Sequence, residues 1–106
     1  MTSKYRAVRT NGYASKAEAR RAIDLRLLVR AGEIRELDEQ VSFTLLPAAP
    51  ELGYKRPLRY VADFVYFTTD GSKRIVEDVK GVQTAVYKIK KRLMNQLLGV
   101  DVTEVK

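Results

Sequence analysis

The feature that most constrains the fold is a β-hairpin signal at Asp70-Gly71. This dipeptide separates two segments rich in aromatic and β-branched residues, 58–67 and 74–79. An Asp-Gly pair between two such segments is the strongest short-range signal for a hairpin. With Asp70 and Gly71 at the centre of the turn, residue 69 faces residue 72. A four-residue loop keeps this pairing, whereas a loop of odd length shifts it by one residue.

Helices are predicted on both sides of this hairpin. Ser15-Lys16-Ala17-Glu18 is a capping box, and the helix that follows is expected to run to Ala31 and to stop at Gly32. Residues 84–98 have apolar side chains at 86, 89, 93 and 97, a helical stripe that we expect to face the core, and Gly99 can end that helix.

The remaining segments complete a single domain. Strands are predicted at 34–37, 41–46 and 100–105, with a loop at 47–57. Residues 1–14 are expected to form a basic arm, and residues 15–106 one α/β or α+β domain of order α-β-β-β-α-β with a small central sheet. The length allows one core, and no apolar run is long enough to span a bilayer or to form a signal peptide. We therefore expect a soluble protein that is not exported.

The composition removes several chemistries. The 106 residues include no His and no Cys, which excludes Ser-His-Asp and Cys-His catalysis and the usual zinc sites. A bound metal would need oxygen ligands, which favours hard ions such as magnesium or manganese. A general base would be a carboxylate, a lysine, a tyrosine or metal-bound water.

Positive charge gathers at both ends of the chain. The net charge of +7 divides into +5 over 1–36, −2 over 37–70 and +4 over 71–106. Two basic clusters favour a polyanion such as nucleic acid, and the alternative is a solvated surface that serves solubility. Tyr5 or Tyr13 is a candidate for stacking on an unpaired base, with ordinary packing as the alternative. The candidate phosphate-binding residues are Lys4, Arg6, Arg9, Lys16, Lys88, Lys91 and Arg92, with Asn95 beside the last three.

The hairpin register places two carboxylates opposite each other. Asp63 pairs with Asp78, and Lys80 lies on the same face because it follows Asp78 by two residues. Paired strand residues have Cβ atoms about 4.5–5.5 Å apart, so like charges there repel. We expect neighbouring Val61, Val65 and Val76 to desolvate the pair, which a divalent metal and Lys80 would stabilise. The alternatives are a solvent-facing Asp63 and a salt bridge for Asp78 and Lys80.

A third carboxylate, Glu18, begins the apolar stripe of the first helix. On the buried side of the first helical turn it can reach a metal over the sheet. The alternative is that Glu18 serves only as the N3 residue of the capping box with Ser15. Glu77 adjoins Asp78 but points to the opposite face, across from Phe64, and is predicted not to be a metal ligand.

Together these residues resemble the PD-(D/E)XK nuclease superfamily. The resemblance rests on a helix glutamate (Glu18), an aspartate in a strand (Asp63), and Asp78-Val79-Lys80 in the next strand, followed by a helix. The resemblance covers residues 4 to about 100. Within the superfamily, the sequence is similar to a small phage-borne branch. Alanine precedes Asp63 where the name-giving motif has proline, a common variation.

The resemblance implies a restriction-endonuclease-like core and metal-dependent phosphodiester cleavage. Asp63 and Asp78 would coordinate one or two Mg²⁺ ions, for which Mn²⁺ would substitute, with Glu18 as a further ligand and the Val79 carbonyl completing the set. Lys80 would orient or deprotonate the attacking water and stabilise charge on the phosphate.

Small members with a helix glutamate are similar to Holliday-junction resolvases. The resemblance therefore implies a homodimer acting on branched DNA, in the cytoplasm of a bacterial or phage-infected cell and away from membranes. Two alternatives remain open. One is a non-catalytic nucleic-acid-binding module, with its acids in salt bridges to Lys80 and arginines. The other is an adaptor of a phage recombination or packaging complex that uses the loop 47–57.

Overall fold

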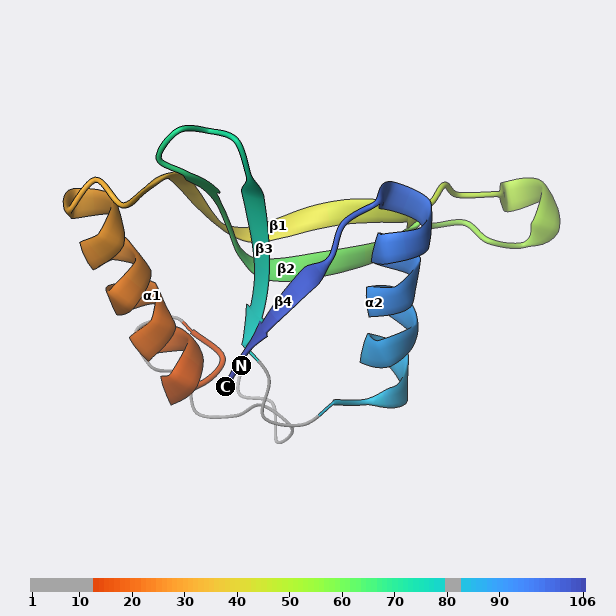
Figure 1. Ribbon diagram of the computed structural model, residues 1–106. Coiled ribbons are helices and arrows are strands. Elements are labelled where there is room, and N and C mark those ends of the chain that lie inside the picture. The colour runs from red at the N-terminus through yellow and green to blue at the C-terminus, as the bar shows by residue number, and fades with distance from the viewer. Residues whose placement is uncertain (1–12, 80–82) are drawn as a thin grey trace.

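The protein has an α+β fold in the predicted order, as the computed structural model in Figure 1 shows; the structure describes residues 13–79 and 83–106. A mixed four-stranded sheet and two helices make up the fold. The elements are α1 (Lys16–Arg30), β1 (Ile34–Leu46), a 3₁₀ turn (Pro50–Leu52), β2 (Leu58–Thr68), β3 (Arg74–Val79), α2 (Ala85–Leu98) and β4 (Val102–Val105). Neither helix is long and apolar enough to cross a membrane.

The sheet has the strand order β1-β2-β3-β4. The first two neighbouring pairs are antiparallel, and β4 pairs with β3 in parallel. The two helices pack against opposite faces of β2 and β3, each over its own apolar cluster. Phe64 and Tyr66 pack with Ala22 and Leu25 of α1. On the other face, the cluster below α2 includes Val65, Val76, Tyr87 and Met94.

The hairpin between β2 and β3 has the predicted register. Phe64 pairs with Glu77 and Val65 with Val76. The loop contains four residues, 69–72, because the Thr68 N–H donates to the Lys73 carbonyl at 3.0 Å. Gly71 adopts the left-handed conformation that this turn requires (φ 75°). Asp70 accepts hydrogen bonds from the Ser72 N–H and the Thr68 hydroxyl, which lower its pKa to about 2.

The segments 34–37 and 41–46 are not separate strands, as the sequence suggested, but parts of one 13-residue strand. Three polar residues, Asp38 to Gln40, interrupt the apolar pattern, yet β2 offers an unbroken partner beside them. The strand accommodates the interruption by bending. Glu36 and Gln40 have positive φ (55° and 53°), and the register shifts between Arg35 and Asp38.

The burial pattern of β2 also departs from simple alternation. Tyr60, Ala62 and Val65 all contribute to the cluster below α2, whereas Val61 is 47% exposed. The prediction that Val61 flanks the carboxylates on a desolvated face was therefore wrong. The residues of β2 that belong to this cluster therefore change from even-numbered before Asp63 to odd-numbered after it.

The apolar stripe predicted to bury α2 lies largely in solvent. Val86, Ile89 and Leu97 are 61%, 60% and 48% exposed, and only Leu93 packs partly against the core. The buried residues are Tyr87 and Met94. The ring of Tyr87 lies beside Tyr60, at 6.4 Å between centroids, so α2 turns Tyr87 and Met94 rather than the apolar stripe toward the core. The predicted helix ends are confirmed by a Thr84 cap and a left-handed Gly99.

A buried ion pair joins α1 to β3. Arg21 donates to both carboxylate oxygens of Glu77, at 2.8 and 2.6 Å, and the Tyr66 hydroxyl donates to Glu77 as well. Glu77 lies opposite Phe64, as predicted, and its bond to Arg21 places it on the side of α1. The carboxylate raises the pKa of Arg21. Burial, and then Glu77, raises the pKa of Tyr66 to about 12. Glu77 therefore has a structural role.

Removing the cation from this pair should destabilise the fold. We expect Arg21→Met to lower the free energy of unfolding by about 3 kcal/mol, because it leaves a buried carboxylate without its counter-charge. Arg26→Met is a matched control, since Arg26 pairs with Glu39 at 3.0 Å in a solvent-exposed position, and its cost should stay below about 1 kcal/mol. Urea unfolding measures both. Equal losses would contradict the structural role of Glu77.

The two faces of α2 should respond differently to substitution. We expect Met94→Ala to cost about 2–5 kcal/mol, because it opens a cavity in the core. Ile89→Ser should change the free energy of unfolding by less than about 0.5 kcal/mol, since Ile89 faces solvent. Chemical denaturation of both variants measures the difference. A large loss for Ile89→Ser would mean that the predicted stripe is buried in solution after all.

Candidate active site

A row of polar side chains crosses the sheet at one level. The register of β1 on β2 places Gln40 level with Asp63. The register of β2 on β3, continued by one residue beyond its last pair, places Asp63 level with Asp78. Asp78 in turn pairs with Glu104 on β4. On β3 the row lies near the C-terminal end of the strand, which points to the end of the molecule where both helices begin (Figure 1).

Gln40 links two of the predicted site residues. Its side-chain Nε2 donates to Glu18 Oε2 at 3.0 Å and to Asp63 Oδ1 at 3.3 Å. Glu18 is 7% exposed, and its backbone N–H donates to the Ser15 hydroxyl at 3.1 Å. Glu18 thus contributes its backbone to the helix cap while its carboxylate faces Gln40. The role of this carboxylate as a metal ligand stays a prediction.

The other oxygen of Asp63 connects it to the neighbourhood of Asp78. Asp63 Oδ2 accepts a hydrogen bond from the Val79 backbone N–H at 2.8 Å. Val79 directly follows Asp78, so this bond ties the side chain of Asp63 to the end of β3. Glu18, Gln40, Asp63 and the Asp78-Val79 segment therefore form a connected chain across α1, β1, β2 and β3.

Asp78 is almost fully buried, at 2% exposure, and lies near two tyrosines. The Tyr60 hydroxyl donates to Asp78 Oδ2, and the Tyr87 hydroxyl donates to Glu104 Oε2 at 2.8 Å. Burial raises the pKa of Tyr60, and Asp78 raises it further. Burial and Glu104 likewise raise the pKa of Tyr87. Both phenols therefore act as neutral hydrogen-bond donors to carboxylates at ordinary pH.

The donor chemistry of the site suits a hard cation. Glu18, Asp63 and Asp78 offer oxygen ligands only, the type that Mg²⁺ and Mn²⁺ prefer, and Glu18 and Asp78 are buried. Among residues 13–79 and 83–106, no group of three or more acidic side chains is arranged to hold a metal ion. The side-chain amide of Gln40 donates to both Glu18 and Asp63, so these two carboxylates are bridged by an amide.

Several predicted residues lie outside the part of the chain that the structure describes: Lys4, Tyr5, Arg6, Arg9 and Lys80. The predicted sharing of a face by Asp78 and Lys80 is therefore untested. Tyr13 is described, and it packs against α1. Its ring lies 5.8 Å from the Arg26 guanidinium carbon, and its hydroxyl accepts a hydrogen bond from Arg26. Tyr13 therefore packs within the fold, which is the alternative to stacking on an unpaired base.

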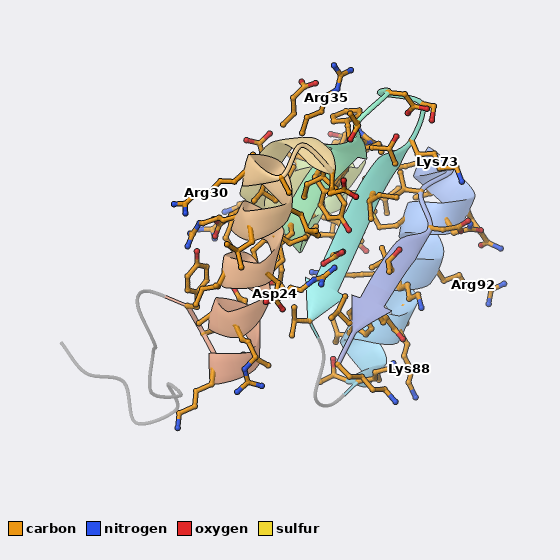
Figure 2. All side chains as sticks on the ribbon, turned by 60° about the vertical axis from the view of Figure 1, so that its left-hand side comes forward. Asp24, Arg30, Arg35, Lys73, Lys88 and Arg92 are labelled. Carbon is orange, nitrogen blue, oxygen red and sulfur yellow. The ribbon has the colours of Figure 1, made fainter. Side chains whose placement is uncertain are left out.

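The basic residues of α2 lie together, as predicted. Lys88, Lys91, Arg92 and Asn95 line one shallow hollow of about 510 Å³ that also includes Glu104. Lys91 pairs with Glu104 at 3.1 Å. The hydrogen bond from Tyr87, and then Lys91, lower the pKa of Glu104. Lys88 and Arg92 project outward from α2 (Figure 2), and Lys16 is exposed at the start of α1.

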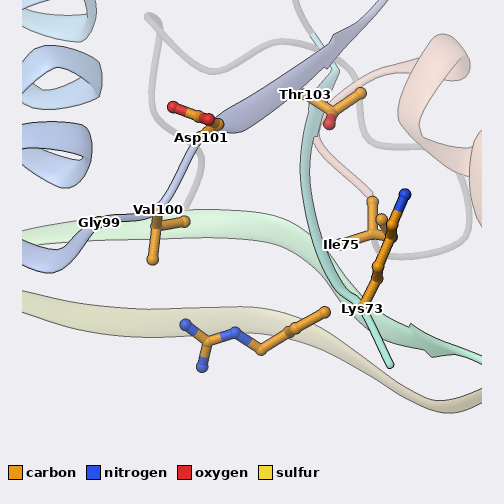
Figure 3. A pocket seen from close by; sticks show the side chains of 7 residues that line it. Lys73, Ile75, Gly99, Val100, Asp101 and Thr103 are labelled. Carbon is orange, nitrogen blue, oxygen red and sulfur yellow. The ribbon is translucent and has the colours of Figure 1, made fainter. Parts of the chain in front are cut away.

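A different hollow, of about 460 Å³, lies between β3 and β4 and is shown in Figure 3. It is lined by Lys73, Arg74, Ile75, Gly99, Val100, Asp101 and Thr103. Lys73 directly precedes β3 and Arg74 begins it, whereas Asp78 stands near its end. This hollow therefore lies apart from the row of carboxylates.

Sequence reasoning missed three residues of this region. Gln40 fell in the gap between two predicted strands, and Tyr60 was not singled out as a site residue. Glu104 carried no signal, because its proximity to Asp78 depends on the parallel pairing of β4. The polar run before Val41 was the one available clue to Gln40.

The stability contributed by Tyr60 should disappear in alkali. Its raised pKa means that the unfolded state releases the phenol proton first, so stability is full below pH ~10 and falls as the pH rises above that value. We expect the free energy of unfolding to fall less steeply in Tyr60→Phe than in the wild type, as measured by urea unfolding across a pH series. Tyr54→Phe, at a 66% exposed position, should keep the wild-type slope. A Tyr60→Phe variant with that slope would contradict the assignment.

Comparison with known proteins gives a family without an assigned activity. No curated protein and no solved structure matches the chain. One family model matches residues 2–104, and its description is a protein of unknown function, DUF1064. Since the match extends over nearly all of the 106 residues, the chain belongs to the DUF1064 family.

Proposed function

We propose that this protein is a metal-dependent endonuclease that hydrolyses phosphodiester bonds in DNA. The observation that carries the proposal is the linkage of Glu18, Asp63 and the Asp78-Val79 segment, which come from α1, β2 and β3. This order of a helix glutamate, a strand aspartate and a following Asp-x-Lys strand is the pattern of the PD-(D/E)XK superfamily. The α-β-β-β-α-β architecture is compatible with that superfamily.

The electrostatics support a cation at this point. Two buried carboxylates and a third nearby are costly to desolvate unless positive charge compensates them. A protein of net charge +7 is suited to a polyanion, yet acids at the centre of its site would repel phosphate. A divalent ion held by these acids would reconcile the two observations, because it binds carboxylates and phosphate together.

In the proposed reaction, each residue of the chain has a defined task. Asp63 and Asp78 would hold Mg²⁺, with Glu18 and the Val79 carbonyl as further ligands. The bound ion would supply Lewis-acid stabilisation of charge on the phosphate. Lys80 would orient or deprotonate the water whose oxygen bonds to phosphorus as one P–O ester bond breaks. The burial of Asp78 and its hydrogen bond from Tyr60 would keep its carboxylate oriented.

The basic surface would bind the DNA backbone. Lys88 and Arg92 of α2, and Lys16 at the start of α1, would contact phosphates, with Lys4, Arg6 and Arg9 adding to the grip. Lys91 would contribute less, because Glu104 already neutralises it. We propose branched DNA as the preferred substrate and a homodimer as the active form, since two copies would provide one site for each cut strand.

A second candidate is a non-catalytic nucleic-acid-binding module. It is favoured by the neutral donors in the site, since Gln40 and Tyr60 hydrogen-bond to carboxylates that a metal would bind. In this case the acids would be structural, and the basic residues would bind nucleic acid without cleavage.

A role as an adaptor has its own supporting observation. The segment 47–57 projects from the sheet (Figure 1) and helps to form a largely apolar hollow of about 530 Å³. The hollow is lined by Leu46, Pro47, Ala49, Leu52, Tyr54, Arg56, Pro57 and Leu58. A partner protein could bind there whether or not the protein is a nuclease.

The decisive experiment is cleavage of a four-way junction, a fork, a linear duplex and a single strand, with Mg²⁺ or with EDTA. We expect junction cleavage with Mg²⁺ and none with EDTA. Asp63→Asn, Asp78→Asn and Lys80→Ala should each lower the cleavage rate by about 100-fold or more while DNA binding persists. Glu18→Gln should also cut more slowly if its carboxylate takes part.

Asp24→Asn is the matched control, because Asp24 is an exposed acid of the same helix as Glu18. It should cut like the wild type. Failure of the wild type to cleave any of the four substrates, together with unchanged DNA binding by Asp78→Asn, would eliminate the nuclease and favour the binding module.

A further inference from the structure

The backbone of Gln40 has an unusual conformation for a strand residue. Its φ of 53° lies in the left-handed region, which side chains other than glycine, asparagine and aspartate enter uncommonly. Among the residues that the structure describes, the other non-glycine residue with positive φ is Glu36, which lies where the register of β1 on β2 shifts. The register on both sides of Gln40 is unchanged. A bulge therefore accounts for Glu36 but not for Gln40.

The side chain of Gln40 offers a reason for this conformation. Its amide nitrogen carries two N–H groups, and it donates to Glu18 on α1 and to Asp63 on β2. Strained backbone is retained where the surroundings over-determine it, most often at functional sites. Here Gln40 combines the left-handed conformation with hydrogen bonds from its amide to two carboxylates, one on α1 and one on β2.

An amide is the side chain that this position needs if both acids are to bind a cation. A lysine or arginine would neutralise the carboxylates and compete with a metal. A glutamate would add a third negative charge. A neutral donor holds the two oxygens near each other and leaves the negative charge in place, as the outer partners of metal ligands commonly do.

We propose that Gln40 is a positioning residue that sets the spacing of Glu18 and Asp63 for a divalent cation. This inference rests on the proposed function, since it takes the two carboxylates to be ligands. It assigns a role to the bent centre of β1, which the nuclease pattern itself does not include.

The test distinguishes the effect of the backbone conformation of Gln40 from the effect of its side-chain amide. Gln40→Gly removes the side chain and fits the left-handed conformation, and Gln40→Met keeps the length of the side chain without its donors. Glu36→Gly is the matched control, because it also replaces a left-handed residue of the same strand by glycine, at an exposed position. Isothermal titration with Mn²⁺ measures metal affinity, and thermal unfolding reports Tm.

We expect Gln40→Gly and Gln40→Met to weaken Mn²⁺ binding by about 10-fold or more. Glu36→Gly should bind Mn²⁺ like the wild type. The Tm of both glycine variants should equal or exceed that of the wild type, since a glycine relieves the strain. A loss of affinity without a loss of Tm is a result that a merely structural role would not produce.

Wild-type Mn²⁺ affinity in folded Gln40→Met would overturn the inference, and so would a wild-type protein that binds no Mn²⁺. The proposed function can fail separately. If Asp63→Asn and Gln40→Met both lose Mn²⁺ affinity but the wild type cleaves no DNA, the positioning role of Gln40 stands and the nuclease does not.

Discussion

The pairing of β2 with β3 is the constraint on which the candidate site depends. Their antiparallel register brings Asp63 level with Asp78, and the same two strands provide the faces on which the two helices pack. A shift of one residue would move Asp78 to the face of α1 and Glu77 to the face of α2. The four-residue loop that begins after Thr68 holds this register through the 3.0 Å bond from Thr68 to Lys73. A short turn thereby determines that Asp63 lies opposite Asp78.

Two adjacent acids in β3 have different surroundings because strand residues alternate between faces. Glu77 lies below α1, where Arg21 neutralises it at 2.6 Å and Tyr66 donates to it. Asp78 lies on the other face, where Tyr60 donates to it. The first is a compensated ion pair that attaches a helix to the sheet. The second is a buried carboxylate that accepts a hydrogen bond from a neutral phenol.

The site combines acidic side chains with neutral hydrogen-bond donors that orient their carboxylates. Gln40 holds Glu18 and Asp63, and the Val79 N–H holds the second oxygen of Asp63. Such contacts fix the orientation of carboxylates without cancelling their charge. They would serve a metal site that is organised before the ion arrives, because little rearrangement would then be needed on binding. Lys88, Lys91 and Arg92 of α2 line a hollow together with Glu104, the residue that pairs with Asp78 across β3 and β4.

The elements that the sequence determined by itself are those with local causes. Ser15 and Thr84 begin the helices, Gly32 and Gly99 follow their ends, and Asp70-Gly71 sets the hairpin, all through contacts within a few residues. The continuity of β1, the rotation of α2 and the places of Gln40, Tyr60 and Glu104 depend on partners far along the chain. Tyr87 of α2 packs beside Tyr60 of β2, and Tyr60 in turn donates to Asp78 of β3. Only the tertiary structure decided these features, because their energies come from packing between distant segments rather than from local pattern.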